Sequence, residues 1–343
     1  MRPFTTASGF GPLPDIVREA GGRSLLRRIF ADAELPVALA EERHLKLPLA
    51  GMVEVFERSA RLLGDPQFGL RVGERMDPRD FGPWTSYVLA APTLDQALRR
   101  CDRLVRFHTS GVRAPLEREG DLAVWTLATS RLLPSHRRHY IDHIIVPMLK
   151  TIASFAGPDW RPTRLEIEYQ PGRLADATRE RLDIDVRFGT AGTRVLFDAA
   201  LLDLGADTTP SVVTDILTFR EIRHALCHRP PRTVAEACRE ILRARLSDGD
   251  ARIDPVARLM CVGVRTLQRR LHQEGTTFRE IMEGLRAERG VVLVVETELP
   301  LGEIAASLGF LDQAHFTRAF RRWTGRPPSA LRARRLKSST MTS

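Results

Sequence analysis

Apolar residues recur at helical spacing in some stretches of this chain and at every second position in others. Segment 97–108 carries its apolar residues on one face of a helix, and 136–157 predicts a long helix with Pro147 as the expected site of a kink. Alternation predicts a half-buried strand at 163–169, and 193–198 is a second strand candidate. The first two-thirds of the chain therefore mixes helices and strands.

Two further patterns complete the expected fold class. Apolar runs on either side of Glu119-Gly120-Asp121 predict a hairpin, although the alternation is imperfect there. After Thr233 the pattern is helical and strand signals nearly vanish. We therefore expect an α+β N-terminal domain without a regular βαβ repeat, followed by an all-α domain.

Residues 301–332 hold a short helix pattern, a glycine turn and a basic helix. Gly309 permits the positive φ of a tight turn, and Asp312 can cap the second helix through its side-chain oxygen. Gly325 and the following prolines end that helix. Its apolar face has the spacing i, i+3, i+4, i+7 and consists of Phe316, Ala319, Phe320 and Trp323. This is the helix-turn-helix pattern, in which the second helix enters the major groove of DNA.

A related unit occupies residues 254–275. Asp254 is its expected cap, Pro255 its expected first helical residue and Gly263 its turn residue. The residues expected to face inward are Val256, Ala257, Met260, Val264, Leu267 and Leu271. A capping box formed by Thr277 and Glu280 then begins a segment that can form a long connecting helix. Two such units indicate DNA binding more strongly than one, since any helical hairpin can imitate a single unit.

The net charge of +9 is distributed unevenly along the chain. Residues 229–343 hold 21 Lys and Arg against 13 Asp and Glu, a net charge of +8, whereas residues 1–228 hold 31 against 30. A basic region joined to a near-neutral one is typical of a polyanion-binding module attached to another domain. On charge alone, a solvated basic face is an equally good interpretation.

Residues 234–335 resemble the DNA-binding domain of AraC/XylS-type bacterial transcription regulators. The sequence IAASLGFLDQAHFTRAFRRWTGRPPSALR carries the resemblance, and it departs from the family pattern at Leu311, where the family often has Ser. The resemblance implies two recognition helices in successive segments of the major groove. The residues expected to read bases are Arg265, Gln268, Arg269, Gln313, His315, Thr317 and Arg318. Those expected to contact phosphates are Arg270, Arg321, Arg322 and Arg334.

The chemistry of these side chains agrees with that assignment. Arg can bond both O6 and N7 of guanine, Gln can bond both N6 and N7 of adenine, and Thr can offer its methyl group to thymine. Arginines that contact phosphates add affinity without sequence preference. For His272 and His315, a solvated or phosphate-facing ring is as good an interpretation as base reading.

The N-terminal part resembles the effector-sensing domain of a longer branch of this family, which includes regulators of ornithine metabolism. This resemblance rests on length, element order and segment 73–98, and the chain opens with helices, unlike the cupin barrel of the arabinose sensor. It implies a small-molecule effector, either a metabolite or a lipid. The expected domains are an effector-sensing and dimerisation domain at 1–205, a linker with a helix at 206–233, the DNA-binding domain at 234–337 and a disordered tail at 338–343.

Three histidines and three aromatic residues in the N-terminal part are candidates for a site. His136, His139 and His143 share one face of a helix, but no Cys and no acid other than Asp142 accompanies them, so we predict no metal and favour a polar face. The aromatic residues Trp84, Tyr87 and Trp125 could line a pocket, although core packing is the favoured interpretation.

The four cysteines lie far apart without C-x-x-C spacing, and we expect them to be buried apolar residues. No nucleotide-binding or hydrolase motif occurs, so no cofactor is expected. One alternative function is a DNA-repair methyl acceptor fused to an AraC-type module, which requires a Pro-Cys-His setting; Cys227 lies in Leu-Cys-His. The other alternative is an architectural DNA-binding protein without an effector.

The predicted function is therefore that of a sequence-specific transcription regulator, an activator controlled by a small molecule, and not of an enzyme. Its expected partners are double-stranded promoter DNA, the effector, RNA polymerase and a second copy of the chain. No apolar run approaches the eighteen or so residues of a membrane span, and the first residues, MRPFTTASGFGPLP, lack the apolar core expected of a signal peptide. We expect a cytoplasmic, nucleoid-associated protein.

Overall fold

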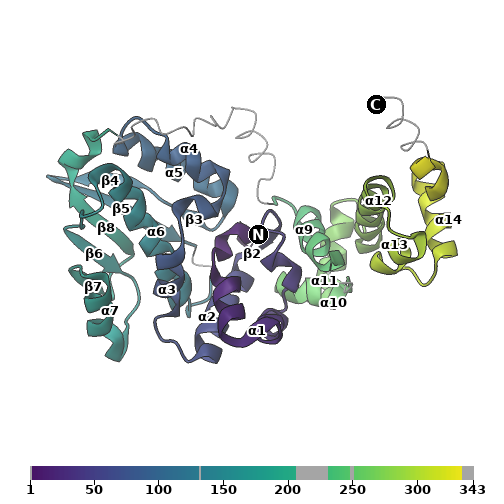
Figure 1. Cartoon of the computed structure of the whole chain (residues 1–343), viewed down its shortest axis with the longest axis horizontal. Helices are drawn as coiled ribbons and strands as arrows, with labels where there is room; N and C mark the ends of the chain where they lie inside the picture. Colours follow the sequence, from purple (N-terminus) through teal and green to yellow (C-terminus); the bar gives the residue numbers. More distant parts are fainter. Residues whose placement is uncertain (1, 131–132, 206–230, 248–250, 334–343) are drawn as a thin grey trace. The chain divides into compact units, whose positions relative to one another are not determined.

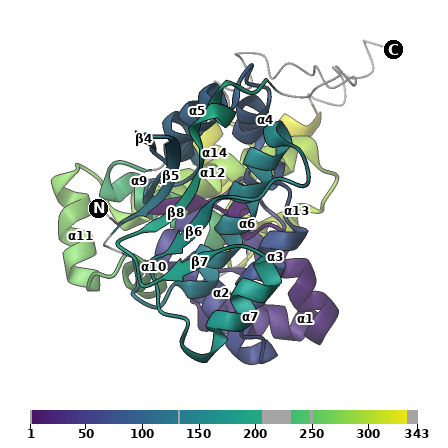
Figure 2. The ribbon, with the colours of Figure 1, turned by 90° about the vertical axis from the view of Figure 1, so that its left-hand side faces the viewer.

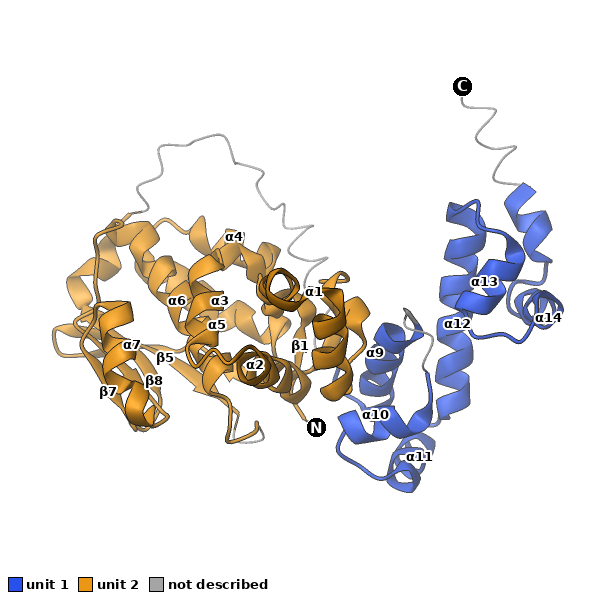
Figure 3. Ribbon diagram, turned by 60° about the horizontal axis from the view of Figure 1, so that its bottom comes forward, with its two compact units in different colours: residues 1, 231–343 blue, residues 2–230 orange. Residues whose placement is uncertain are grey.

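The computed structural model of the chain describes residues 2–130, 133–205, 231–247 and 251–333. The chain divides into two compact units, residues 2–230 and 231–343 (Figure 3). The expected domain boundaries stay predictions, because residues 206–230 of the expected linker, its helix and the expected tail lie outside the described residues.

Helices make up most of the first 110 residues of the first unit (Figure 1). The helices of this unit are α1 (Leu13–Asp32), α2 (Leu49–Leu63), α3 (Phe68–Arg75), α4 (Pro83–Leu89), α5 (Leu94–His108), α6 (Arg138–Ala156) and α7 (Ala175–Leu182). Shorter 3₁₀ turns are η1 (Ala7–Phe10), η2 (Val37–Ala40), η3 (Pro78–Phe81), η4 (Gly172–Leu174) and η5 (Ala199–Asp203). The predicted helices at 97–108 and 136–157 are confirmed as α5 and α6, and Pro147 lies inside α6.

The strands of this unit form two sheets. They are β1 (Phe4–Thr6), β2 (Lys46–Pro48), β3 (Val112–Arg113), β4 (Leu116–Glu119), β5 (Leu122–Thr129), β6 (Arg164–Ile167), β7 (Val186–Phe188) and β8 (Thr193–Asp198). β1 pairs with β2, and the larger sheet has the order β3-β5-β8-β6-β7, with β4 also paired to β5 (Figure 2). The predicted hairpin is β4–β5, closed where Glu119 pairs with Leu122. The predicted strands are β6 and β8, so the expected α+β class is confirmed.

Helices α3 and α6 approach closely because α3 presents two glycines one turn apart. A Cβ atom on Gly69 would lie 2.4 Å from the carbonyl oxygen of His139, and one on Gly73 would lie 3.0 Å from that of His143. The Gly69 N–H donates to Nδ1 of His139 over 3.3 Å. Backbone-to-backbone packing therefore fixes the position of α6, the helix that carries the candidates His139 and His143.

Gly69→Ala should lower the free energy of unfolding of this unit by about 1–3 kcal/mol, because the new methyl group can be accommodated only by moving α3 away from α6. Thermal unfolding of the full chain measures the effect. Gly192→Ala is the matched control, since nothing lies within 4 Å of a Cβ atom at that position. Equal unfolding temperatures for the two variants would contradict the close-packing argument.

The described part of the second unit is helical throughout. Its helices are α9 (Val234–Ser247), α10 (Ile253–Leu259), α11 (Val264–Gln273), α12 (Phe278–Glu296), α13 (Leu301–Ser307) and α14 (Gln313–Thr324). The predicted capping box is present at the start of α12, where Thr277 Oγ1 accepts from the Glu280 backbone and Glu280 accepts from the Thr277 backbone. Helix α12 contacts α9 as well as α13 and α14, so it joins the two halves of the unit. The all-α prediction is confirmed.

Candidate functional site

The second helix-turn-helix unit consists of α13, a glycine turn and α14. Gly309 has φ of 72°, the left-handed conformation that the turn pattern predicts. The Asp312 carboxylate caps α14 by accepting the His315 backbone N–H over 2.7 Å, and this bond holds the pKa of the Asp312 carboxyl below its usual value. Gly325 ends the helix with φ of 75°. The local signals in the sequence therefore predicted this unit correctly.

The apolar face of α14 packs into a cluster of buried side chains. Phe316 and Phe320 are fully buried, with ring centroids 5.5 Å apart, and Trp323 is half-buried beside them. The same cluster includes Val294 of α12 together with Ile304 and Leu308 from α13 and its turn. This packing fixes which face of α14 remains open to solvent.

The four candidate base readers of α14 lie off the buried face. Gln313, His315 and Arg318 are exposed, and Thr317 is half-buried. The ring of His315 is not free, because its Nδ1 lies 3.0 Å from the Asp312 carboxylate. Arg318 forms no ion pair within the described residues, so its guanidinium is available to a partner. Leu311, the departure from the family pattern, is 94% exposed just before this helix.

The first helix-turn-helix unit consists of α10 and α11 and corrects three expectations. Helix α10 begins at Ile253 and is preceded by Arg252, so Asp254 is not the cap and Pro255 is not the first helical residue. Proline is accepted anywhere in the first turn, since no N–H there bonds within the helix, and it therefore does not mark the start. Met260 is only half-buried, and Leu259 occupies the buried position instead.

The turn of this unit also differs from the expectation. Gly263 precedes α11 with φ of −72°, and the left-handed residue is Cys261, with φ of 52°. In α11, Leu267 and Leu271 are fully buried against the rest of the unit, as expected. The remaining candidates on this helix are all exposed: Arg265, Gln268, Arg269 and Arg270. Both units therefore present a basic helix whose apolar side is buried.

The arginines expected to contact phosphates have different surroundings. Arg321 is exposed, whereas Arg322 pairs with Glu283 of α12 over 3.6 Å in an exposed position. Arg334 lies outside the described residues. Arg332, two residues earlier, donates to the Val294 carbonyl over 3.1 Å, so it holds the segment after α14 against α12.

Arg286 of α12 holds the glycine turn between α13 and α14, and the sequence analysis did not predict this role. Its guanidinium lies 5.1 Å from the ring centroid of Phe310 and donates to the Gly309 carbonyl over 3.3 Å. Partial burial lowers the pKa of Arg286. No local pattern connects residues 23 positions apart, so the sequence held no signal for this contact.

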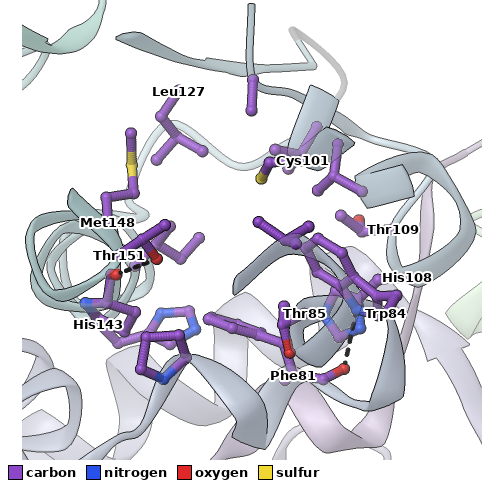
Figure 4. A pocket seen from close by; sticks show the side chains of 18 of the residues that line it. Phe81, Trp84, Thr85, Cys101, His108, Thr109, Leu127, His143, Met148 and Thr151 are labelled. Carbon is purple, nitrogen blue, oxygen red and sulfur yellow. Dashed lines mark hydrogen bonds between the residues drawn. The ribbon is translucent and has the colours of Figure 1, made fainter. Parts of the chain in front are cut away.

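The first unit contains a cavity between α4, α5, α6 and strand β5 (Figure 4). The space open to the centre of a water molecule measures about 70 Å³, which is room for several waters. Trp84 and Trp125 line it; Trp125 is also buried in the core, as the favoured interpretation predicts, whereas Trp84 is half-buried. Tyr87 instead stacks under Arg100, with 4.2 Å from the guanidinium to its ring centroid.

The three candidate histidines do not share one helix, because His136 precedes α6 and only His139 and His143 lie on it. His136 is exposed and lies 3.4 Å from the Glu54 carboxylate, and His139 accepts from Gly69. His143 lines the cavity, where its Nδ1 donates to the Tyr140 carbonyl over 2.5 Å. No group of three His, Cys, Asp or Glu side chains suited to a metal occurs among the described residues.

The cysteines also differ from one another. Cys238 is buried as expected, but Cys261 is exposed, and Cys101 is half-buried at the cavity. The expectation that all four are buried is therefore wrong for Cys261, whose left-handed conformation places it in an exposed turn. Cys227, the candidate methyl acceptor of the alternative function, lies outside the described residues. Burial raises the pKa of Cys101 to about 12, so its thiol is unreactive at neutral pH.

The sequence of this chain is similar to those of known transcription regulators. Residues 26–205 match the "Arabinose-binding domain of AraC transcription regulator, N-term", and residues 256–334 match a helix-turn-helix domain. The HTH-type transcriptional regulator VirS of Mycobacterium tuberculosis is 25% identical over 93% of both chains. The ornithine utilization regulator of Pseudomonas aeruginosa is 25% identical over 93% of this chain and 94% of its own. The crystal structure of the transcriptional regulator CdpR from Pseudomonas aeruginosa aligns with 89% of this chain and 97% of its own at 25% identity, with a TM-score of 0.40.

Proposed function

The chain belongs to the AraC-type transcription regulators, and on this premise we propose that it activates transcription by binding promoter DNA through α11 and α14 in response to a small molecule. The matched helix-turn-helix domain makes it a DNA-binding regulator and not an enzyme. The observation that supports the two-helix interface is the repeated arrangement of an exposed basic face on a helix whose apolar side is buried.

The proposed readers of bases are the exposed side chains of these two helices, namely Arg265, Gln268, Arg269, Gln313, His315, Thr317 and Arg318. Arg270 and Arg321 are proposed to contact phosphates, and so is Arg322 once it leaves Glu283. Family membership also supports three further proposals: a homodimer, contact with RNA polymerase during activation, and a cytoplasmic location. None of the described helices combines the length and the apolar composition that crossing a membrane requires.

A DNase footprint on the intergenic region beside the protein's own gene tests the proposed regulator. We expect a protected site of about two helical turns for each protomer, because each recognition helix covers one major-groove segment. Retention of any DNA with strong salt sensitivity and no protected site would contradict sequence-specific binding.

Arg318→Ala should weaken binding to that site by about 1–3 kcal/mol and binding to random DNA much less, because a bidentate arginine distinguishes guanine from the other bases. Fluorescence anisotropy with both DNAs over a series of salt concentrations measures the two losses. Arg321→Ala is the matched control on the same helix, and it should weaken both DNAs alike and reduce the salt slope by about one. An equal loss on both DNAs for Arg318→Ala would make Arg318 a phosphate contact.

A further inference from the structure

The cavity of the first unit is notable for the side chains that line it. Among the described lining residues there is no Asp, Glu, Lys or Arg. Most of the wall is aliphatic or aromatic, and Figure 4 shows Cys101 and Leu127 across the open space from Phe81 and His143. A charged molecule placed there would lose its hydration without gaining a counter-charge from these residues.

The two histidines of the wall do not supply that counter-charge at neutral pH. His108 and His143 are 7% and 1% exposed. Burial lowers the pKa of each imidazole to about 3, and for His108 the nearby Lys46 ammonium lowers it further. Both rings are therefore neutral and act as aromatic surface with some hydrogen-bonding capacity. His143 stacks on Phe56 at 4.1 Å between ring centroids, and His108 lies 5.9 Å from Trp84.

Thr109 is a polar group of the wall whose hydrogen-bonding capacity is unused. It is 3% exposed, and its Oγ1 has no hydrogen-bond partner among the described residues. Four other polar groups of the wall are already satisfied by backbone carbonyls. Thr151 Oγ1 donates to Pro147 over 2.8 Å, Thr85 Oγ1 to Gly82 over 2.6 Å, and the indole N–H groups of Trp84 and Trp125 to Phe81 and Ala114, each over 3.1 Å.

A buried hydroxyl without a partner costs free energy, and a ligand that bonds to it removes that cost. We propose that this cavity binds an uncharged, mainly apolar effector that forms a hydrogen bond with the Thr109 hydroxyl. This inference rests on the proposed function, since it names the chemical class of the effector that controls DNA binding. A sugar would bring several hydroxyls without partners, and a charged amino acid would bring charges that nothing in the described wall compensates.

Isothermal titration of the full chain with matched small molecules tests the class of effector. 1-Hexanol, hexanoate and hexylammonium share one chain and differ in the charge of the head group, and indole offers an uncharged aromatic alternative. We expect 1-hexanol or indole to bind saturably with one molecule for each chain, at least tenfold tighter than hexanoate and hexylammonium. L-arabinose and L-ornithine should not bind this cavity. Binding of any charged compound or of arabinose as tight as that of the uncharged probes would overturn the proposal.

Two variants with the same change of shape test the hydrogen bond. Thr109→Val should weaken the probe that binds about tenfold, whereas Thr151→Val, whose hydroxyl is already bonded to Pro147, should change its affinity less than twofold. The unfolding temperature of Thr109→Val should not fall, because the hydroxyl that it removes has no partner in the described protein. Unchanged affinity in Thr109→Val, or equal losses in both variants, would overturn the contact with Thr109.

DNA binding by the same preparations separates this inference from the proposed function. Site-specific DNA binding without binding of either uncharged probe would overturn the cavity proposal alone. Binding of an uncharged probe by a protein that recognises no specific DNA would support the cavity and overturn the proposed function. A change in DNA affinity when the probe binds would support both.

Discussion

Lowering the pH from 7.5 to 5 should destabilise the first unit strongly, because two buried histidines and one half-buried histidine are held in the neutral form. Burial lowers the pKa of His108 and His143 to about 3 and that of His139 to about 4. In the unfolded chain each ring has the ordinary value of about 6.5. Between these values the unfolded chain binds more protons than the folded one, so the free energy of unfolding falls as the pH falls below about 6.5.

The expected loss at pH 5 is about 2 kcal/mol for each histidine, which is a large part of the stability of a domain of this size. Asp142 acts in the opposite direction, since burial raises the pKa of its carboxyl and the folded state takes up that proton more readily. Arg138 and Tyr169, which contact this carboxylate, limit its shift. Burial also raises the pKa of the Glu57 carboxyl, which acts in the same direction as Asp142. The net result remains a loss of stability, because three histidines oppose these two carboxyl groups.

Urea unfolding followed by tryptophan fluorescence at each pH measures this loss. Trp323→Phe is a suitable background, because the remaining tryptophans, Trp84, Trp125 and Trp160, all belong to residues 2–230. His108→Gln in that background removes one titrating ring and leaves Asp142 in place, so its stability should fall by about 2 kcal/mol less between the two pH values. If both proteins lost the same free energy, His108 would not be buried in its neutral form.

Local sequence signals predicted the second helix-turn-helix unit better than the first for a physical reason. Gly309, Asp312 and Gly325 each act through their own backbone or a neighbour three residues away, and each occupies its expected place. The predicted start of α10 was wrong by two residues, because a proline such as Pro255 is tolerated throughout a first turn. A cap or a turn can be predicted when few residue types fit the position.

The cavity could not be predicted in the same way, because its walls come from segments far apart in the sequence. Thr109 follows α5, Trp84 lies on α4, Trp125 on β5 and His143 on α6. The histidine spacing correctly placed His139 and His143 on a helix, but it could not show that His143 is buried and His139 half-buried. Burial of this kind depends on the close packing of α3 against α6 at Gly69, which no periodicity indicates.

Phe316→Ala should abolish site-specific DNA binding, although Phe316 faces away from the proposed interface. Phe316 is fully buried, with ring centroids 5.6 Å from Phe310 and 5.5 Å from Phe320. It also packs against α12 at Gly290, where a Cβ atom would lie 3.5 Å from its ring. Removing a fully buried phenyl ring costs about 3–5 kcal/mol, because the lost contacts leave a cavity that the neighbours fill only in part. Helix α14 would then no longer be held at a fixed orientation to α12.

Thermal unfolding and anisotropy with specific and random DNA measure the two effects of Phe316→Ala. Leu311→Ala is the control for stability, because it also truncates a large apolar side chain near α14 but at a position 94% exposed, where we expect a change within about 0.5 kcal/mol. Binding to random DNA should persist in Phe316→Ala through α11, whose buried residues Leu267 and Leu271 do not belong to the Phe316 cluster. Normal unfolding and normal specific binding in Phe316→Ala would mean that this cluster does not position the recognition helix.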